Sequence, residues 1–127
     1  MTGSQTAAGA QLLQRFRARA ISFSKPRLFS ADILVQFADV PVIVRVRDGS
    51  VTEIVEHRVP LQSSDFSIKG TSEGWTKFWQ SMPPAGWHDI FALNKRKEFS
   101  IEGNLQPLMA HLQYVKDLLA CARESIK

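Results

Sequence analysis

Apolar and polar residues alternate in three consecutive runs between residues 32 and 59. The second and third runs meet at Asp48-Gly49, which is the strongest short-range signal for a β-hairpin because both central residues of such a turn adopt positive φ. Asp39 and Pro41 form a turn between the first run and the second. The pattern therefore predicts three antiparallel strands over residues 32–38, 42–47 and 51–59, each with one buried face.

The middle of the chain switches between strand and helix periods. Residues 65–70 have the alternation of a short strand, with Phe66 and Ile68 on one face. A helix is predicted from Thr71 or Ser72, because the aromatic residues that follow are spaced three and four apart and so share a side. A rigid loop containing Met82, two prolines and a glycine then leads into a short helix predicted over residues 87–93.

Residues 97–119 carry the strongest pattern in the chain. Phe99 and Ile101 alternate with polar residues as in a strand. Gly103 and Asn104 indicate a helix start, because the Asn side chain accepts a hydrogen bond from a free amide of the first turn. A wide apolar stripe at three- and four-residue steps then predicts one long helix that covers a sheet. Its members are Leu105, Leu108, Met109, Leu112, Val115, Leu118 and Leu119.

Helices grouped after runs of strands indicate an α+β fold, with one sheet that is exposed to solvent on one face and covered by helices on the other. A chain of 127 residues is long enough for one core and too short for two. We therefore expect one folded domain over residues 31–127, preceded by a basic N-terminal arm over residues 1–30.

The arm contains a predicted amphipathic helix over residues 10–23, after a segment, residues 1–9, that we expect to be disordered. Three interpretations of this helix stay open. It packs on the domain, or it makes transient contact with a membrane surface through Arg15, Arg17 and Arg19, since such helices place Arg around an apolar face. The third is an organellar transit peptide, because the segment is Arg-rich, contains Ser and has no acid.

The net charge of +4 does not indicate a nucleic-acid binder, because its distribution is uneven. Residues 1–31 carry five basic side chains and no acidic one, so the remaining 96 residues sum to −1. A nearly neutral domain lacks the basic groove that binds phosphates. No apolar run is long enough for a membrane span, and the N-terminus lacks the apolar block of a secretory signal. We therefore expect a soluble cytoplasmic protein.

Residues able to perform chemistry are few and scattered. Cys121 has no second thiol and no zinc-ligand spacing, so we interpret it as a packed helix residue. Asp65 and Asp89 begin elements and are interpreted as turn or first-turn residues. His57, His88 and His111 belong to a strand, a short helix and the last helix. No phosphate loop, nucleophile elbow or metal spacing is present, so we expect no cofactor, no metal and no catalytic residue.

The segment from about Ile33 to Leu119 resembles the sterol carrier protein domain, also called the non-specific lipid-transfer domain. Two stretches carry the resemblance: residues 65–75, which read as that family's strand and following helix, and residues 91–104, which read as its strand, Gly-polar turn and closing helix. The resemblance implies a single mixed, mostly antiparallel five-stranded sheet, helices on one face, and an apolar cavity between them for sterol, fatty acid, acyl-CoA or phospholipid. It implies no catalytic residues.

The sequence thus favours non-catalytic binding of an apolar small molecule or lipid by a carrier or sensor, and it leaves the oligomeric state open. We expect large and flexible apolar residues near the Pro-Gly loop and on the last helix to line the cavity. They are Phe37, Trp75, Phe78, Trp79, Met82, Trp87, Phe91, Leu108, Met109 and Leu112. The alternatives are an isomerase, dehydratase or hydrolase-type α+β enzyme with an Asp–His pair such as Asp65 and His57 as general base, and an interaction-only protein.

Overall fold

The computed structural model describes residues 3–26, 28–56, 64–80, 82–83, 85–87 and 89–123, and the side chains of these residues except those of 3–8 and 56. His57, His88, Pro84 and the end of the third predicted strand lie outside the described residues. None of the described helices is long and apolar enough to cross a bilayer.

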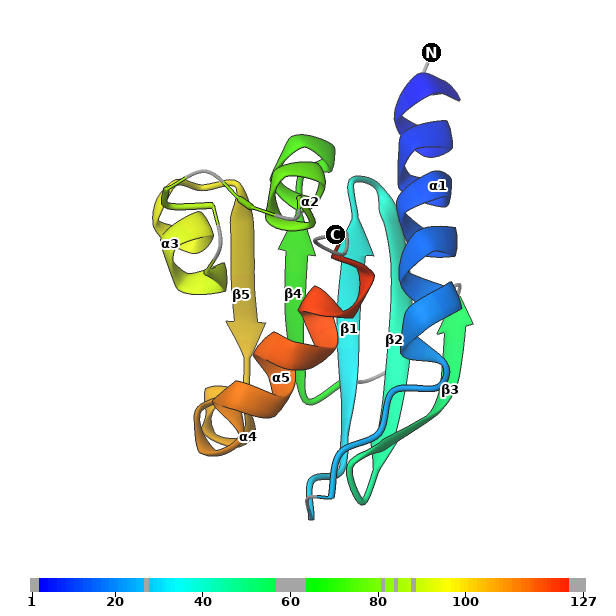
Figure 1. The fold of residues 1–127 in the computed structure, drawn as a ribbon, viewed down its shortest axis with the longest axis vertical. Helices are drawn as coiled ribbons and strands as arrows, with labels where there is room; N and C mark the ends of the chain where they lie inside the picture. The colour runs from blue at the N-terminus through cyan, green and yellow to red at the C-terminus, as the bar shows by residue number, and fades with distance from the viewer. Residues whose placement is uncertain are drawn as a thin grey trace.

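One five-stranded sheet, in the order β3-β2-β1-β4-β5, forms the centre of the molecule (Figure 1). Strand β1 (Ala31–Phe37) pairs antiparallel with β2 (Val40–Arg47), which pairs antiparallel with β3 (Ser50–Glu56). On its other side β1 pairs in parallel with β4 (Phe66–Gly70), and β4 pairs antiparallel with β5 (Phe99–Gly103). The predicted α+β class with a mixed, mostly antiparallel five-stranded sheet is confirmed.

Helices α1 (Gly3–Ala20) and α5 (Leu112–Leu119) lie in front of the sheet in Figure 1 and cover one of its faces, and α2 (Ser72–Phe78) lies at the end of β4. Helix α3 (Ile90–Lys95) lies beside β5, and α4 (Leu105–Ala110) precedes α5. A short 3-10 helix, η1 (Ala120–Ala122), follows α5 and contacts α1. The covered face is apolar, since every second residue of β1 is buried.

Several element boundaries follow from single side chains that the sequence marks. Thr71 caps α2 by accepting a hydrogen bond from the Gly74 amide, and Asn104 caps α4 in the same way from the Gln106 amide. Asp48 and Gly49 have φ of 51° and 81°, as the predicted hairpin turn requires. The strand, turn and helix-start predictions at these positions are confirmed.

The N-terminal helix is longer than predicted at its beginning. Helix α1 starts at Gly3, so the expected disorder of residues 1–9 is wrong for the described part, and the helix ends at Ala20 instead of residue 23. Residues 7, 8 and 10 are Ala, which has the highest helix propensity. Gly9 is tolerated because α1 passes close to the β1–β2 turn: a Cβ there would lie 2.6 Å from the Phe37 carbonyl oxygen.

Helix α1 packs on the sheet, which is the first of the three interpretations of the N-terminal segment. Leu12, Leu13, Phe16 and Ala20 are buried in the same hydrophobic core as β1 and α5. The apolar positions predicted for one helical face therefore do face the protein interior. The core that the sheet and the C-terminal helices form is incomplete without this helix.

The predicted single C-terminal helix is wrong, because it divides at His111. The backbone of His111 has φ −127° and ψ 39°, which ends α4 and lets α5 leave in a new direction. The imidazole packs against Phe29, with 4.8 Å between ring centroids. The bend places Val115, Leu118 and Leu119 in the core while Leu105 and Met109 of the same stripe stay exposed.

The short helix before β5 begins later than predicted. Asp89 accepts a hydrogen bond from the Phe91 amide and so acts as the N-cap of α3, which runs from Ile90 to Lys95. Trp87 therefore lies outside the helix and not in its first turn. The sequence interprets Asp89 as a turn or first-turn residue, and the structure places it at the N-cap, directly before the first turn.

Candidate functional site

Six aromatic rings from four separate elements form a continuous buried cluster between the sheet and the helices, here called the aromatic layer. The Phe37 ring of β1 lies 4.9 Å from that of Trp75 and 5.2 Å from that of Phe16, centroid to centroid. The Trp75 ring lies 5.2 Å from that of Trp79. These spacings are typical of aromatic pairs in direct contact. The members are Phe16, Phe37, Trp75, Phe78, Trp79 and Phe99.

Each indole N–H in the aromatic layer has a main-chain acceptor. Trp75 Nε1 donates to the Gln36 carbonyl at 2.9 Å, and Trp79 Nε1 donates to the Leu119 carbonyl at 2.7 Å. These bonds connect α2 to β1 on one side and to the end of α5 on the other. They fix the orientation of both rings and leave the aromatic faces for apolar contacts.

The structure separates the ten predicted ligand-binding residues into three groups. Those completely or almost completely buried in the core are Phe37, Trp75, Phe78, Trp79 and Leu108. Those half-buried against the core are Trp87, Phe91 and Leu112. The two methionines are exposed, Met82 by 77% and Met109 by 56%. The four aromatic residues of the first group lie together, whereas Met82 and Met109 contribute little to the interior.

Phe16 and Phe99 also belong to the aromatic layer, and neither is among the ten predicted ligand-binding residues. The predicted set is based mainly on the high density of Trp and Phe within residues 75–91, and Phe16 and Phe99 lie outside that segment. A weaker signal was present for both residues. Phe16 lies on the apolar face of its helix, and Phe99 lies on the apolar face of its strand.

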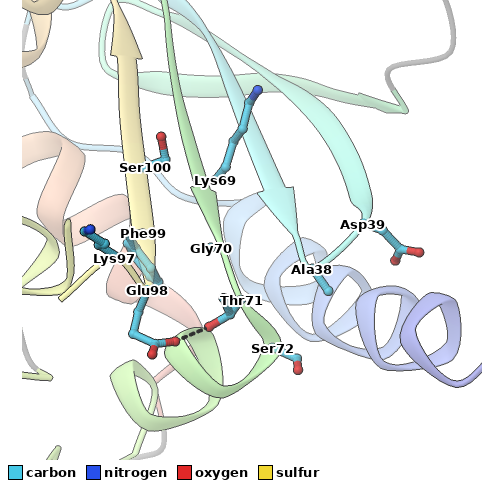
Figure 2. A pocket seen from close by; sticks show the side chains of 10 residues that line it. All are labelled: Ala38, Asp39, Lys69, Gly70, Thr71, Ser72, Lys97, Glu98, Phe99 and Ser100. Atoms are coloured by element: carbon cyan, nitrogen blue, oxygen red, sulfur yellow. Dashed lines mark hydrogen bonds between the residues drawn. The ribbon is translucent and has the colours of Figure 1, made fainter. Parts of the chain in front are cut away.

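A pocket of about 370 Å³ lies at the end of the sheet where β4 passes into α2 (Figure 2). It is lined by residues 38–39, 69–72 and 97–100, with Phe99 as its aromatic side chain and with more apolar than polar surface. A second pocket of about 300 Å³ lies between α1 and α2, where Arg15 and Ser72 are among its lining residues. None of the ten predicted residues lines either pocket.

Helix α4 is amphipathic but only one of its side chains is buried. Leu108 points into the core, whereas Leu105 and Met109 are 42% and 56% exposed. The segment from residue 103 to residue 115 contains no Asp, Glu, Lys or Arg. The outer side of α4 is therefore an uncharged surface with exposed apolar side chains.

Arg15 and Arg17 of α1 bind main-chain carbonyl groups of other elements. Arg15 donates from Nε to the Ala122 carbonyl at 3.0 Å and from Nη2 to the Trp79 carbonyl at 3.3 Å. Arg17 donates to the Ile54 carbonyl at 2.7 Å. Arg123 donates to the Phe78 carbonyl at 2.9 Å, and burial lowers its pKa. Cations thus satisfy the last carbonyl groups of α2, where the helix dipole favours positive charge.

The nucleophile and acid candidates have structural roles. Asp65 accepts a hydrogen bond from the Asp32 amide at 2.8 Å, and Asp89 forms an ion pair with Lys116 at 3.3 Å. Burial raises the pKa of the Cys121 thiol to about 12, so it stays protonated and is a poor nucleophile. Among the described residues no group of three His, Cys, Asp or Glu side chains is placed to hold a metal ion.

Comparison with solved structures identifies the architecture. A crystal structure of sterol carrier protein 2 superposes with a TM-score of 0.57 at 15% sequence identity, covering 97% of this chain and 96% of that one. The fold is that of sterol carrier protein 2. Thirteen chains of solved structures match, and the resemblance noted in the sequence is thereby confirmed for the fold. No protein-family model matches the sequence, and no curated protein matches it.

Two further structures share the sterol carrier protein 2 fold. One is a ubiquinone synthesis protein, UbiJ-SCP2, with a TM-score of 0.51, 15% identity, and coverage of 94% of this chain and 90% of that one. The other is palmitated SCP2L2 from Aedes aegypti, with a TM-score of 0.51, 14% identity, and coverage of 83% and 90%.

Proposed function

We propose that this protein binds a lipid with a long hydrocarbon chain between the sheet and the helices, and that it acts as a carrier or sensor without catalysis. The observation that carries the proposal is the aromatic layer: six large rings from α1, β1, α2 and β5 meet between the sheet and the helices of a sterol carrier protein 2 fold. A solved structure with the same fold, SCP2L2 from Aedes aegypti, is palmitated.

Burial of the hydrocarbon chain supplies enough free energy for this function. Each buried CH₂ group contributes about 0.8 kcal/mol, so about ten methylenes correspond to a micromolar dissociation constant, which is about −8 kcal/mol. A chain of 14 to 18 carbons leaves a surplus of roughly 3 to 6 kcal/mol for separating side chains. Such a ligand needs few polar contacts, which fits a site made of aromatic and aliphatic groups.

Binding requires side chains to move apart, because the rings of the aromatic layer touch one another. We propose that helix α4 makes this movement, because it contributes little to the core. Leu108 is its one buried side chain, and the helix is bounded by Gly103, with positive φ, and by the bend at His111. We place the hydrocarbon chain between the aromatic layer and the side chains of Leu108 and Leu112.

Native mass spectrometry of the purified full chain, with and without palmitic acid, tests the proposal. We expect one palmitate per chain. A second measurement reports the position: 9,10-dibromostearate quenches tryptophan fluorescence on contact, with stearate as the unbrominated control. Because Trp87 lies outside the aromatic layer, the Trp87→Phe variant should keep most of the quenching, whereas Trp75→Phe combined with Trp79→Phe should lose it. Absence of uptake, or quenching that disappears in Trp87→Phe alone, would contradict the proposal.

A further inference from the structure

Strand β3 forms one edge of the sheet, because β2 is its one neighbour among the described strands (Figure 1). The main-chain N–H and C=O groups on the outer side of an edge strand are available to a further strand. Four of the seven residues of β3 are β-branched, a composition that favours strand pairing. The strand contains neither proline nor lysine, two residues that proteins place on edge strands to prevent such pairing.

The first half of this edge is covered by residues 23–25, which follow α1. The Val51 N–H donates to the Phe23 carbonyl at 3.0 Å, and the Lys25 N–H donates to the Gly49 carbonyl at 2.9 Å. A register shift between β2 and β3 also interrupts the regular ladder near this point. A further strand therefore cannot pair with the first residues of β3.

The second half of the edge is covered by one side chain, that of Arg17. Its Nη2 donates to the Ile54 carbonyl at 2.7 Å across a separation of 37 residues. The N–H and C=O of one residue in an antiparallel strand point to the same side, so the Ile54 N–H also faces outward. No main-chain group of another described residue bonds to Ile54 from that side. Arg17 thus places a charged group where the next strand would lie.

The uncovered edge would be complementary to the same edge of a second copy. Two β3 strands related by a two-fold axis run antiparallel and present the same surface to each other. With the axis at Ile54, Glu53 lies opposite Val55 of the other copy, and Thr52 lies opposite Glu56. Within residues 52–56 no two like charges are opposed, and opposed like charges are what destabilises an antiparallel pair.

We propose that the β3 edge is a dimerisation surface for a second copy of this chain, and that Arg17 keeps this edge closed. Helix α1, which carries Arg17, packs on the sheet through Leu13 and Phe16, so the guanidinium is held at the edge while α1 is docked. Removal of the guanidinium uncovers the Ile54 main-chain groups and lets two five-stranded sheets join. This proposal does not depend on lipid binding.

Sedimentation velocity of the full chain over a dilution series tests the proposal. We expect Arg17→Ala to reach about twice the mass of the unmodified protein, as a closed two-fold dimer does. Arg17→Lys should keep the unmodified mass, because its ammonium group also donates to a carbonyl and leaves a charge at the edge. Arg19→Ala is the matched control and should keep the unmodified mass, because the Arg19 side chain is exposed and makes no hydrogen bond with a described residue.

Two substitutions at Val55 verify that β3 is the surface in contact. In the Arg17→Ala background, Val55→Glu opposes two glutamates twice in each dimer, so the mass should return to that of the unmodified protein. Val55→Lys forms two Glu–Lys pairs instead and should dimerise roughly tenfold more tightly than Arg17→Ala alone. Both variants lose the same half-buried valine, so the cost to the fold is similar, and circular dichroism verifies that each is folded.

Hydrogen exchange locates the contact independently of mass. The Ile54 amide should exchange more slowly in the Arg17→Ala dimer than in the unmodified protein, because it gains a main-chain acceptor. An unchanged mass in Arg17→Ala, or the same increase in Arg17→Lys or Arg19→Ala, would overturn the proposal. Equal masses of the two Val55 variants, or unchanged exchange at Ile54 in a dimer, would overturn it as well, because the contact would then lie elsewhere.

Discussion

The ring of Phe99 lies 4.5 Å from the ring of Trp75 at an interplanar angle of 42°, and this contact depends on the absence of a side chain at Gly70. A Cβ at Gly70 would lie 2.6 Å from Phe99 Cε1 and 2.6 Å from Trp75 Nε1. The indole N–H of Trp75 donates to the Gln36 carbonyl of β1. One glycine therefore allows β4 to carry α2 and β5 close enough for their aromatic residues to meet.

Gly70→Ala should destabilise the protein by about 1–3 kcal/mol, because the added methyl group forces Phe99 and Trp75 out of their packing. Urea unfolding followed by circular dichroism measures the change. Phe99→Ala alone should cost about 3–5 kcal/mol through the cavity it leaves. In the double variant the added methyl group occupies space left by the Phe99 ring. The destabilisation of the double variant should therefore be smaller than the sum of the destabilisations of the two single variants. Strict additivity would contradict this steric explanation.

Arg15→Ala should cost about 1–3 kcal/mol, because the carbonyl groups of Ala122 and Trp79 lose a donor while partly buried. Arg15→Lys should not restore the loss, since an ammonium group cannot donate from two fixed nitrogens as the guanidinium does. Arg19→Ala is the control, because the Arg19 side chain is exposed and makes no hydrogen bond with a described residue. Thermal unfolding of the three variants provides the comparison, and equal losses in Arg15→Ala and Arg19→Ala would refute the assigned role.

Alkaline pH should destabilise the fold between about pH 9 and pH 12. Burial raises the pKa of Tyr114 from 10.0 to about 12 and that of Cys121 from 9.0 to about 12, so the folded state holds both protons more tightly than the unfolded state does. The contribution is complete below the unfolded pKa values and is lost as the pH rises through the folded ones. The free energy of unfolding, measured by urea titration at pH 8, 9.5 and 11, should fall along this series. In Cys121→Ala the free energy of unfolding should fall less between pH 8 and pH 9.5 than in the unmodified protein. The same pH dependence in both proteins would contradict the raised pKa of Cys121.

Trp87 is held between two cations, with Lys77 Nζ 4.3 Å and Arg96 Cζ 4.8 Å from its ring centroid. Replacing both cations with Met should cost about 1 kcal/mol and expose the indole. Acrylamide quenching of the tryptophan emission should increase, because Trp75 and Trp79 are buried and Trp87 is the accessible ring of the three. Lys95→Met is a suitable control, since Lys95 makes no cation–π contact with Trp87.

The elements that the sequence predicted well are those in which a local signal and the global fold agree. Val42, Val44 and Val46 alternate strictly and Asp48-Gly49 marks the hairpin turn, so the strands and their antiparallel pairing followed from the pattern, whereas the register shift between Arg45 and Val46 did not. Thr71 and Asn104 are caps whose side chains act within three residues of their own position. Such signals need no knowledge of the rest of the chain.

The parts that the sequence missed depend on partners far along the chain. The bend at His111 accompanies a contact with Phe29, more than eighty residues earlier, and the apolar stripe around it has the same period in a straight helix as in a bent one. Phe16 and Phe99 enter the aromatic layer through tertiary packing alone. The pocket beside α2 brings together three segments from residues 38 to 100, and no sequence window contains them all.

The hydrogen bond from Arg15 to the Ala122 carbonyl spans 107 residues and has a consequence for biosynthesis. The first helix leaves the ribosome long before its partner exists, and at about 5 to 20 residues per second the interval is roughly 5 to 20 s. For more than half of that interval Phe16 lacks its stacked partner Trp79, and throughout it helix α1 lacks the 3-10 helix η1 that it contacts in the folded protein. The nascent chain thus exposes to chaperones an amphipathic helix whose apolar side chains are flanked by arginines. Slow translation of the last third of the chain would prolong this exposure.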